Sequence, residues 1–218
     1  MVVIFLVDDK TAEEFTKYMK KFPDLYVSLS DIVKKYTTSS RPFIVDLGCG
    51  PGLLSLEILR QIPDATVIGV DPLNKMLSLA KKNVNDAGIE GFELLRGVSE
   101  KIPLRDASID TLVSRFSLAY WKHPDVSFYE MHRVLRPGGK IVFETLNRDF
   151  PKWKLFCIKI GMFVKNAGKD VIRYHVDAYK VAYTMENVEM FFNNAGFIIL
   201  EKEGKKGEWK FIIVAEKQ

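Results

Sequence analysis

Apolar and polar positions repeat with two different periods along the middle of the chain. Short runs such as TVIGVD at 66–71 fit buried strands, whereas LLSLEILRQI at 53–62 repeats its apolar positions as a packed helix does. The pattern predicts strands over 43–47, 66–71, 92–96, 109–114 and 140–146, and helices over 52–62, 74–87 and 124–135. Because strands and helices alternate, we expect a parallel sheet with helices on both faces.

The end of the chain breaks this alternation. After a helix that should start near Thr184, two strand-like runs over 197–203 and 209–216 flank a short turn that contains GKKG. Two such runs joined by a glycine-containing turn are typical of an antiparallel hairpin. The prediction is an α/β fold with a seven-stranded, mostly parallel sheet, helices on both faces and a C-terminal antiparallel hairpin.

Two helices are expected before the sheet begins. Thr11 with Glu14 three residues later suggests a capping box for a helix over 11–21, and a second helix should run over 25–36. The linker TTSSRP follows. The apolar start MVVIFLV is too short for a secretory signal. We expect it to form an edge strand or to pack on the core or on a partner chain.

A long segment separates the strand at 140–146 from the helix near Thr184. This insertion, 147–183, is rich in aromatic and basic residues and leaves from a strand end, where ligands bind in open α/β sheets. Its stretch WKLFCIKIGMFVK has interspersed lysines. It could cover an apolar pocket, touch a membrane surface or pack against a second subunit as in a homodimer. Aromatic and basic residues can also bind single-stranded RNA, but no RNA-binding module accompanies them.

Length and composition favour one ordinary globular domain. The chain has 218 residues, 47% of them apolar and 28% charged, with a mild net charge of +4 that does not by itself indicate nucleic acid. Two cysteines, Cys49 and Cys157, imply no disulfide framework, so a cytoplasmic protein is expected. No segment is long enough to span a bilayer. We divide the single domain 1–218 into N-terminal helices (1–40), a core (41–146), the insertion (147–183), and a last helix with the hairpin (184–218).

The stretch FIVDLGCGPG at 43–52 carries the first sign of chemistry. A strand ends at Asp46, glycines follow at Gly48, Gly50 and Gly52, and a helix should begin near Pro51. Glycine permits the tight turn and lets a ligand approach the backbone, and the N–H groups at the helix start attract polar or anionic groups. The next strand ends at Asp71, where a nucleoside-binding unit places a carboxylate on the ribose hydroxyls.

These motifs resemble a known family. The dinucleotide fingerprint would need glycine or alanine where Leu53 stands, whereas DLGCGPG resembles motif I of the class I S-adenosylmethionine-dependent methyltransferases, whose sheet is Rossmann-like. The likeness covers roughly 40–146 and extends to further motifs in family order. These are Asp71-Pro72 with Met76, the stretch RGVSEKIPL at 96–104, the strand and loop at 109–116, and VLRPGGK at 134–140. The chain is closest in pattern to the small-molecule branch called methyltransferase type 11, similar to ubiquinone/menaquinone methyltransferases.

The resemblance implies S-adenosylmethionine as cofactor, with S-adenosylhomocysteine as product. The residues that it assigns to the cofactor are Asp46, Gly48, Cys49, Gly50, Gly52, Asp71, Pro72, Met76, Gly97, Val98, Ser99 and Arg115. One departure concerns the acid that usually follows Gly97 and meets the adenine amino group, because Val98 stands there. Ser99, the backbone or apolar packing would have to hold adenine instead.

Candidates for the acceptor side are Arg115, Tyr120, His123 and His175. Arg115 suits a carboxylate or phosphate, and the two histidines titrate near neutrality and so suit a base. Methyl transfer needs alignment more than a dedicated base, and we assign none. The family usually has a histidine pair where Tyr120 and Trp121 stand. Since metal-ligating residues are not clustered at ligand spacing, we predict no metal.

The expected function is therefore methyl transfer from S-adenosylmethionine to a small or lipophilic acceptor. No Asn-Pro-Pro-Tyr type motif, associated with amino-group methylation of nucleic acids and proteins, follows the fourth strand. Two alternatives stay open: an RNA or protein methyltransferase, and a non-catalytic protein that binds the cofactor and acts on a partner. A nicotinamide-dependent oxidoreductase ranks third because of Leu53.

Overall fold

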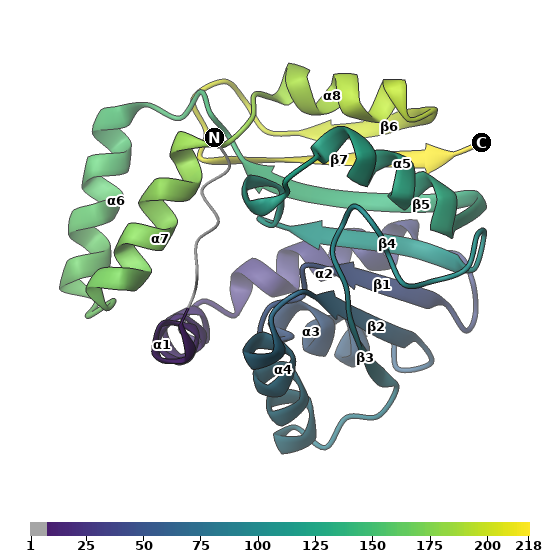
Figure 1. Ribbon diagram of the computed structural model, residues 1–218, viewed down its shortest axis with the longest axis horizontal. Coiled ribbons are helices and arrows are strands. Elements are labelled where there is room, and N and C mark those ends of the chain that lie inside the picture. Colours follow the sequence, from purple (N-terminus) through teal and green to yellow (C-terminus); the bar gives the residue numbers. More distant parts are fainter. Residues whose placement is uncertain (1–7) are drawn as a thin grey trace.

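A computed structural model describes residues 8–218, which form one mixed sheet flanked by helices (Figure 1). The expected role of 1–7 as an edge strand or packed segment falls outside these residues. The strand order is β3-β2-β1-β4-β5-β7-β6, and β7 runs antiparallel to both of its neighbours. The predicted seven-stranded α/β sheet with a C-terminal hairpin is confirmed. The strands are β1 Phe43–Leu47, β2 Thr66–Asp71, β3 Phe92–Arg96, β4 Ile109–Arg115, β5 Leu135–Leu146, β6 Phe197–Glu203 and β7 Lys210–Lys217.

Helices cover both faces of the sheet. On one face α2 (Asp24–Tyr36) and α3 (Leu53–Gln61) pack on the central strands, and α4 (Asn74–Asp86) lies beside α3 over β2 and β3. On the other face α5 (Pro124–Val134) packs beside α8 (Met185–Asn194). Because both faces are covered, the central strands β1 and β4 are buried along nearly their whole length, as parallel strands usually are.

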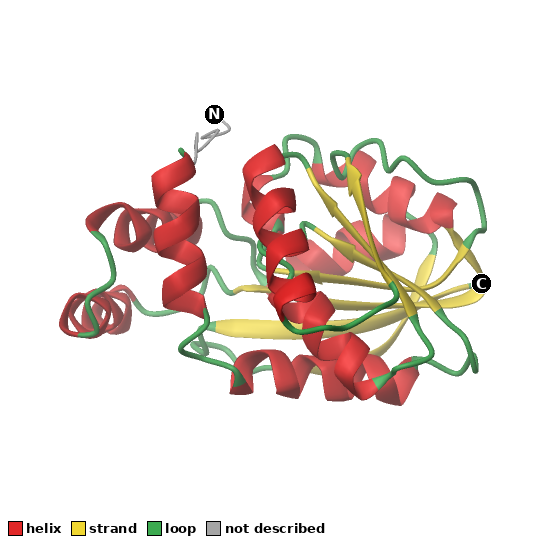
Figure 2. Cartoon of the chain, turned by 90° about the horizontal axis from the view of Figure 1, so that it is seen from below, coloured by secondary structure: helices red, strands yellow, loops and turns green. Residues whose placement is uncertain are grey.

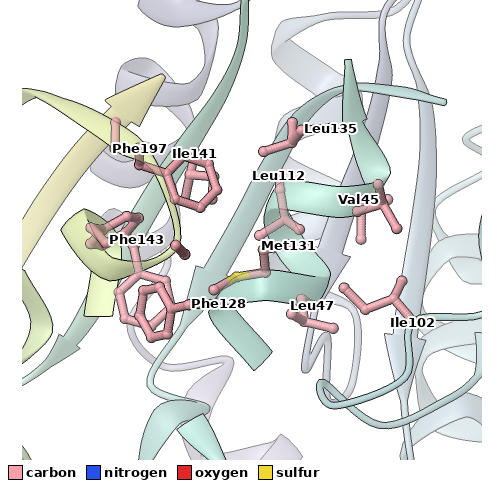
Figure 3. Close-up of a cluster of buried hydrophobic side chains, with 14 of the residues drawn as sticks. Val45, Leu47, Ile102, Leu112, Phe128, Met131, Leu135, Ile141, Phe143 and Phe197 are labelled. Carbon is pink, nitrogen blue, oxygen red and sulfur yellow. The ribbon is translucent and has the colours of Figure 1, made fainter. Parts of the chain in front are cut away.

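Aromatic rings dominate the core beneath α5 and α8. The Phe128 ring lies 4.8 Å from that of Phe192 and 5.4 Å from that of Phe143. Figure 3 shows Phe128 and Met131 of α5 directed toward Phe143, Leu112 and Leu47 of the sheet. All of these side chains are almost fully buried. This packing fixes α5 against the strands whose carboxyl ends carry the site described below.

The order of the strands reverses beside β1. Chain order runs outward from β1 to β2 and β3 on one side, while β4 pairs with β1 on the other. Ligands of open α/β sheets bind in the crevice at this switch point, outside the carboxyl ends of the strands. Three helices lie beyond those ends: α1 (Asp9–Met19), α6 (Lys152–Val164) and α7 (Lys169–Lys180) (Figure 1). Figure 2, seen from below, shows the same grouping.

Several boundaries differ from those expected. The helix α1 begins at Asp9, because Asp8 accepts a hydrogen bond from the Thr11 N–H at 2.7 Å and so caps the helix in place of the predicted Thr11–Glu14 box. The helix α3 begins at Leu53 and not near Pro51, since Gly52 has φ +70° and cannot yet be helical. The strand β5 starts at Leu135, earlier than the 140 predicted.

The insertion folds as the two helices α6 and α7. Its two ends meet, because Asn147 forms a parallel bridge with Tyr183 and the Arg148 N–H donates to the Tyr183 carbonyl at 3.1 Å. Closing the segment at its base allows the helices to project past the sheet while staying attached to β5. The helix α7 also contacts α1 and the short 3₁₀ turn at Leu118–Tyr120.

Candidate functional site

The glycine loop is tied to the neighbouring strand by its backbone. The N–H groups of Gly48 and Cys49 donate to the Val70 carbonyl at 2.7 and 3.1 Å. Asp71, at the end of β2, accepts hydrogen bonds from the N–H groups of Gly50 at 3.0 Å and Leu73 at 2.9 Å. One carboxylate therefore holds both loops that follow β1 and β2, and this sets the shape of the crevice between them.

A cavity of about 580 Å³ opens at this crevice. That volume is within the range of small-molecule sites. Its lining is mainly apolar and comes from the glycine loop, the N-terminal helices and the insertion. The predicted site residues that line it are Asp46, Gly48, Cys49, Gly50, Asp71, Pro72, Met76, Gly97, Val98, Ser99, Arg115, Tyr120 and His175. Three aromatic residues of the N-terminal helices also line it: Phe15, Tyr18 and Tyr26.

Two predicted site residues do not line the cavity. Gly52 lies at the start of α3, where a Cβ would come within 2.9 Å of the Ala80 Cβ, so its part is to let the loop and α4 approach closely. His123 precedes α5, and its N–H donates to the Glu100 carboxylate at 2.9 Å. Neither residue is placed to touch a ligand in the cavity.

Asp46 is a buried carboxylate beside the cavity. Asp46 is only 2% exposed, and the Ser55 hydroxyl donates a hydrogen bond to its carboxylate at 2.6 Å. Burial raises the pKa of Asp46 to about 6, and repulsion from Asp71 adds to this effect. No salt bridge to Asp46 occurs among residues 8–218. The site thus holds an anionic group whose charge the protein only partly balances.

Arg115 brings a buried cation to the same cavity. Its Nε donates to the Glu144 carboxylate at 2.7 Å, while Glu144, which is fully buried, also pairs with Lys210. The guanidinium lies 4.7 Å above the Tyr26 ring and 4.3 Å from that of Phe116. The Arg115 Nη2 is buried without a hydrogen-bond partner within the described chain. A donor left in this state is suited to an anionic oxygen of a ligand.

The wall that α7 forms with the 3₁₀ turn at Leu118–Tyr120 is aromatic. The rings of Tyr120 and Tyr174 are stacked 4.9 Å apart, and His175 lies beside Phe15 with ring centroids 5.7 Å apart. The His175 Nδ1 is 3.1 Å from the Val171 carbonyl oxygen. Because a carbonyl only accepts, Nδ1 carries the hydrogen, and burial lowers the pKa of the ring. A neutral His175 therefore has Nε2 as an unprotonated acceptor.

The far end of the cavity contains Met76, Pro72 and Val98. Met76 is buried, whereas Val98 is 45% exposed at the rim. The Ser99 hydroxyl donates to Glu100 at 3.2 Å and accepts from Ser127 at 2.9 Å, which leaves it one lone pair for a further donor. Glu100 also lines the cavity, so an acid is present two residues after the position where Val98 replaces the expected one.

Comparison with known proteins identifies the family to which this chain belongs. The methyltransferase domain family matches residues 45–143. The demethylmenaquinone methyltransferase of Lactobacillus johnsonii is 32% identical over 150 residues, which cover 67% of this chain and 61% of that protein. The chain belongs to the class I S-adenosylmethionine-dependent methyltransferases. Its cofactor is accordingly S-adenosylmethionine.

Other members of this class agree with that assignment. The ubiquinone/menaquinone biosynthesis C-methyltransferase UbiE of Bartonella quintana is 27% identical over 167 residues, which cover 71% of this chain and 63% of that protein. This chain thus spans a little over three fifths of the length of both curated relatives. A crystal structure of a SAM-dependent methyltransferase from Aquifex aeolicus is 18% identical and has a TM-score of 0.71, with 94% of this chain and 98% of that one covered. That likeness concerns the fold.

The cavity carries charged groups that match those of S-adenosylmethionine. S-adenosylmethionine carries an ammonium, a carboxylate and a sulfonium. The cavity offers the partly balanced Asp46 carboxylate and the unpartnered Arg115 donor. A Cβ built on Gly50 would meet nothing within 4 Å, so the loop leaves open space for a ligand at that point. Among residues 8–218 no cluster of three or more metal-ligating side chains exists, and no helix there is long and apolar enough to cross a membrane.

Some residues at the cavity were not predicted from the sequence. Glu144 pairs with Arg115, and Lys210 pairs with Glu144. The cavity is also lined by Tyr174, Tyr179 and Trp209. A signal for Glu144 was present: it is an acid inside the apolar run KIVFETL, and charged residues are almost never fully buried unless paired. Its partners could not be identified, because Lys210 is 66 residues away in the chain and comes close only through the antiparallel pairing of β5 with β7.

Proposed function

We propose that this protein transfers the methyl group of S-adenosylmethionine to a small, lipophilic acceptor held beneath α6 and α7. The observation that carries the proposal is the continuity of the cavity, which extends from the glycine loop to Leu155, Ile158 and Met162 on the inner side of α6. One apolar space thus borders both the cofactor loop and the insertion. The similarity to a demethylmenaquinone methyltransferase and to a ubiquinone/menaquinone C-methyltransferase supports an acceptor of this kind.

The cofactor is proposed to lie with its ribose on Asp71 and its adenine between Pro72, Met76 and Val98. The methionine end would then reach Asp46 and Arg115, which meet its ammonium and carboxylate respectively. Bound S-adenosylmethionine supplies a methyl group on a positively charged sulfur, which leaves as a neutral thioether in an in-line displacement. The remaining task of the chain is to align the acceptor and exclude water, because charge is dispersed rather than created in that step.

Replacing Asp71 with alanine is expected to weaken binding of S-adenosylhomocysteine by about 1.5–3 kcal/mol, the range for hydrogen bonds to charged groups. Part of the loss would come from the ribose contact and part from the freed N–H groups of Gly50 and Leu73. Calorimetric titration measures the affinity. The matched variant Asp110→Ala removes a buried carboxylate that lies outside the cavity and should leave the affinity unchanged. An unchanged affinity for Asp71→Ala would contradict the ribose assignment.

Replacing Asp46 with asparagine is expected to stabilise the cofactor-free protein while weakening cofactor binding. The pKa of Asp46 is about 6 in the folded protein against an ordinary 3.8, so the folded state binds the proton more tightly. The contribution of Asp46 to stability therefore falls as pH rises from about 4 through about 6, and it is unfavourable by about 1–3 kcal/mol at pH 7. The asparagine variant should have the higher unfolding free energy at pH 7, and the difference should shrink toward pH 4. Urea unfolding at both pH values checks this; equal stability at pH 7 would contradict it.

The acceptor is proposed to lie against Tyr120, Tyr174 and His175. Flat aromatic walls suit a ring-shaped acceptor, and the unprotonated Nε2 of His175 suits the removal of a proton from an acceptor hydroxyl or amine. The pKa of His175 is lowered by burial, so the ring stays neutral at physiological pH. Of the two roles expected for Arg115, contact with the cofactor and contact with the acceptor, we propose the first, with its guanidinium on the cofactor carboxylate.

Transfer of labelled methyl groups from S-adenosylmethionine tests the proposal. The panel should contain quinols with apolar side chains, amines, amino acids, RNA and protein, with mass spectrometry of each product. Saturable transfer to the apolar ring compounds is the expected result. Transfer only to RNA or protein would support the first alternative function. Tight binding of S-adenosylmethionine without transfer to any class would support a non-catalytic binding protein.

A further inference from the structure

The helix α6 is apolar on two opposite sides. On its inner side Leu155, Ile158 and Met162 line the cavity. On its outer side five large apolar residues are exposed to solvent by half to three quarters of their area. We call these residues the α6 outer face: Trp153 at 66%, Phe156 at 62%, Ile160 at 49%, Phe163 at 68% and Val164 at 73%. A helix that is apolar all round is normally covered on all sides, so the α6 outer face is expected to have a partner.

The outer face is a continuous stripe by helix geometry. Its residues follow one another at steps of three, four, three and one positions, which places them within one side of an α-helix. Figure 1 shows α6 as the outermost helix at this end of the molecule, with α7 between it and the sheet. Within residues 8–218 the rings of Phe156 and Phe163 have no aromatic partner. The stripe is therefore available to a partner from outside.

Lysines flank the stripe on both sides. At 100° per residue, Lys152 and Lys159 fall directly beside it on one side, and Lys154 falls farther round the helix on the other. The sequence from 150 to 169 contains no aspartate or glutamate. Exposed rings flanked by lysines are the pattern of a helix that lies in a membrane interface, with its rings in the acyl boundary and its lysines among anionic head groups.

We infer that the α6 outer face docks on an anionic lipid bilayer. The helix has 13 residues, about 20 Å of length, which is too short to span a bilayer but suits one that lies flat on its surface. A second copy of this chain fits less well. In a two-fold dimer the same patch meets itself, which would bring the lysines of the two copies together without an acid between 150 and 169 to pair with them.

Docking in this way places the cavity next to the lipid. One side of α6 would contact the bilayer while its other side lines the cavity, so only one helix would separate the two. A lipophilic acceptor dissolved in the bilayer would have a short path to the cavity and would not need to cross water. The docking surface does not rest on the proposed methyl transfer, because vesicle binding is measured without an acceptor.

Sedimentation with vesicles tests the inference on the full chain. Binding to vesicles of equimolar phosphatidylcholine and phosphatidylglycerol is expected. Binding should be at least ~tenfold weaker to vesicles of phosphatidylcholine alone, and at least ~tenfold weaker to the anionic vesicles in high salt. The double variant F156E/F163E should lose at least ~tenfold in binding to the anionic vesicles. The matched control Y129E/M190E changes two residues of similar exposure on α5 and α8 and should bind as the wild type does. Both variants should keep their affinity for S-adenosylhomocysteine, which shows that they are folded.

Other outcomes would overturn the inference in distinct ways. No binding of the wild type to anionic vesicles would exclude this partner, as would equal binding by F156E/F163E. A wild-type dimer in analytical ultracentrifugation that F156E/F163E converts to monomers would assign the outer face to a second copy of the chain. If deletion of 1–7 abolished vesicle binding while F156E/F163E did not, the apolar N-terminal sequence would be the anchor instead. None of these results depends on whether a methyl group is transferred, so a failed docking surface is distinguishable from a failed function.

Discussion

Replacing Arg115 with glutamine is expected to lower the affinity for S-adenosylhomocysteine by about ten- to hundredfold and to destabilise the fold by about 3–5 kcal/mol. The first effect is the loss of a charged hydrogen bond to the ligand carboxylate, which contributes about 1.5–3 kcal/mol. The second arises because the fully buried Glu144 would keep only Lys210 as a cationic partner, and breaking a buried pair leaves an uncompensated charge. Calorimetry and urea unfolding measure the two effects separately.

A second ligand and a second variant separate the two roles of Arg115. Methylthioadenosine lacks the carboxylate, so its affinity should change little in a folded Arg115→Gln protein. The variant Lys210→Gln removes the other cation beside Glu144 but leaves the guanidinium in place, because Lys210 does not line the cavity. It should therefore lose stability without a matching loss of affinity for S-adenosylhomocysteine. If Arg115→Gln instead left that affinity intact and raised the KM of the acceptor, the guanidinium would serve the acceptor.

The sheet could be predicted from the sequence because each strand carries its own local signal. The apolar runs at 43–47 and 66–71 coincide with β1 and β2, because these two strands are buried along nearly their whole length. The run at 92–96 coincides with β3, a partly exposed edge strand. Helix starts were less accurate. Asp8 and Thr11 are both residue types that favour the N-cap position. Only the hydrogen bond from the Thr11 N–H to Asp8 shows that the helix begins after Asp8. Patterns thus locate elements well but do not decide between neighbouring caps.

The site was predictable at the glycine loop and less so elsewhere. Asp46, Gly48, Gly50 and Asp71 are close in sequence to the strand ends that position them, so the motif alone brings them together. Tyr174 and Lys210 reach the cavity region through the insertion and the hairpin, which no local pattern relates to the loop. His123 has a residue type that suits a base, but its position before α5 places it outside the cavity lining, which its residue type alone does not show.

Two buried groups at the cavity lack full compensation in the cofactor-free protein. Asp46 is buried with a raised pKa, and the Arg115 Nη2 is buried without a partner in the described chain. Each costs free energy in the absence of ligand, and each is matched by an opposite charge on the cofactor. The cofactor should therefore stabilise the fold strongly, beyond what an apolar ligand of equal size would do. A stabilising substitution at Asp46, such as Asp46→Asn, is expected to weaken binding.

Replacing Gly48 with alanine is expected to destabilise the protein by about 2–5 kcal/mol. Gly48 has φ +76°, a conformation that costs other residues about 1–2 kcal/mol. A Cβ there would also lie 2.5 Å from the Ser117 Cβ. Relieving such a clash in a packed site costs a further 1–3 kcal/mol, roughly. The displaced loop would strain the hydrogen bonds from Gly48 and Cys49 to Val70. Urea unfolding of the cofactor-free protein gives the free-energy change.

Two other glycines separate the clash from the backbone strain. Gly88, at φ +63°, lies at the end of α4 away from the cavity, and a Cβ there would meet nothing within 4 Å, so Gly88→Ala should lose only about 1 kcal/mol. Gly50 has φ +51° and equally open surroundings, but it lines the cavity. Gly50→Ala should therefore match Gly88→Ala in stability while binding S-adenosylhomocysteine at least about tenfold more weakly, because its methyl group would occupy ligand space. Equal binding by these two variants would mean that the cofactor does not approach the loop at Gly50. Equal stability of all three would mean that Ser117 moves aside freely.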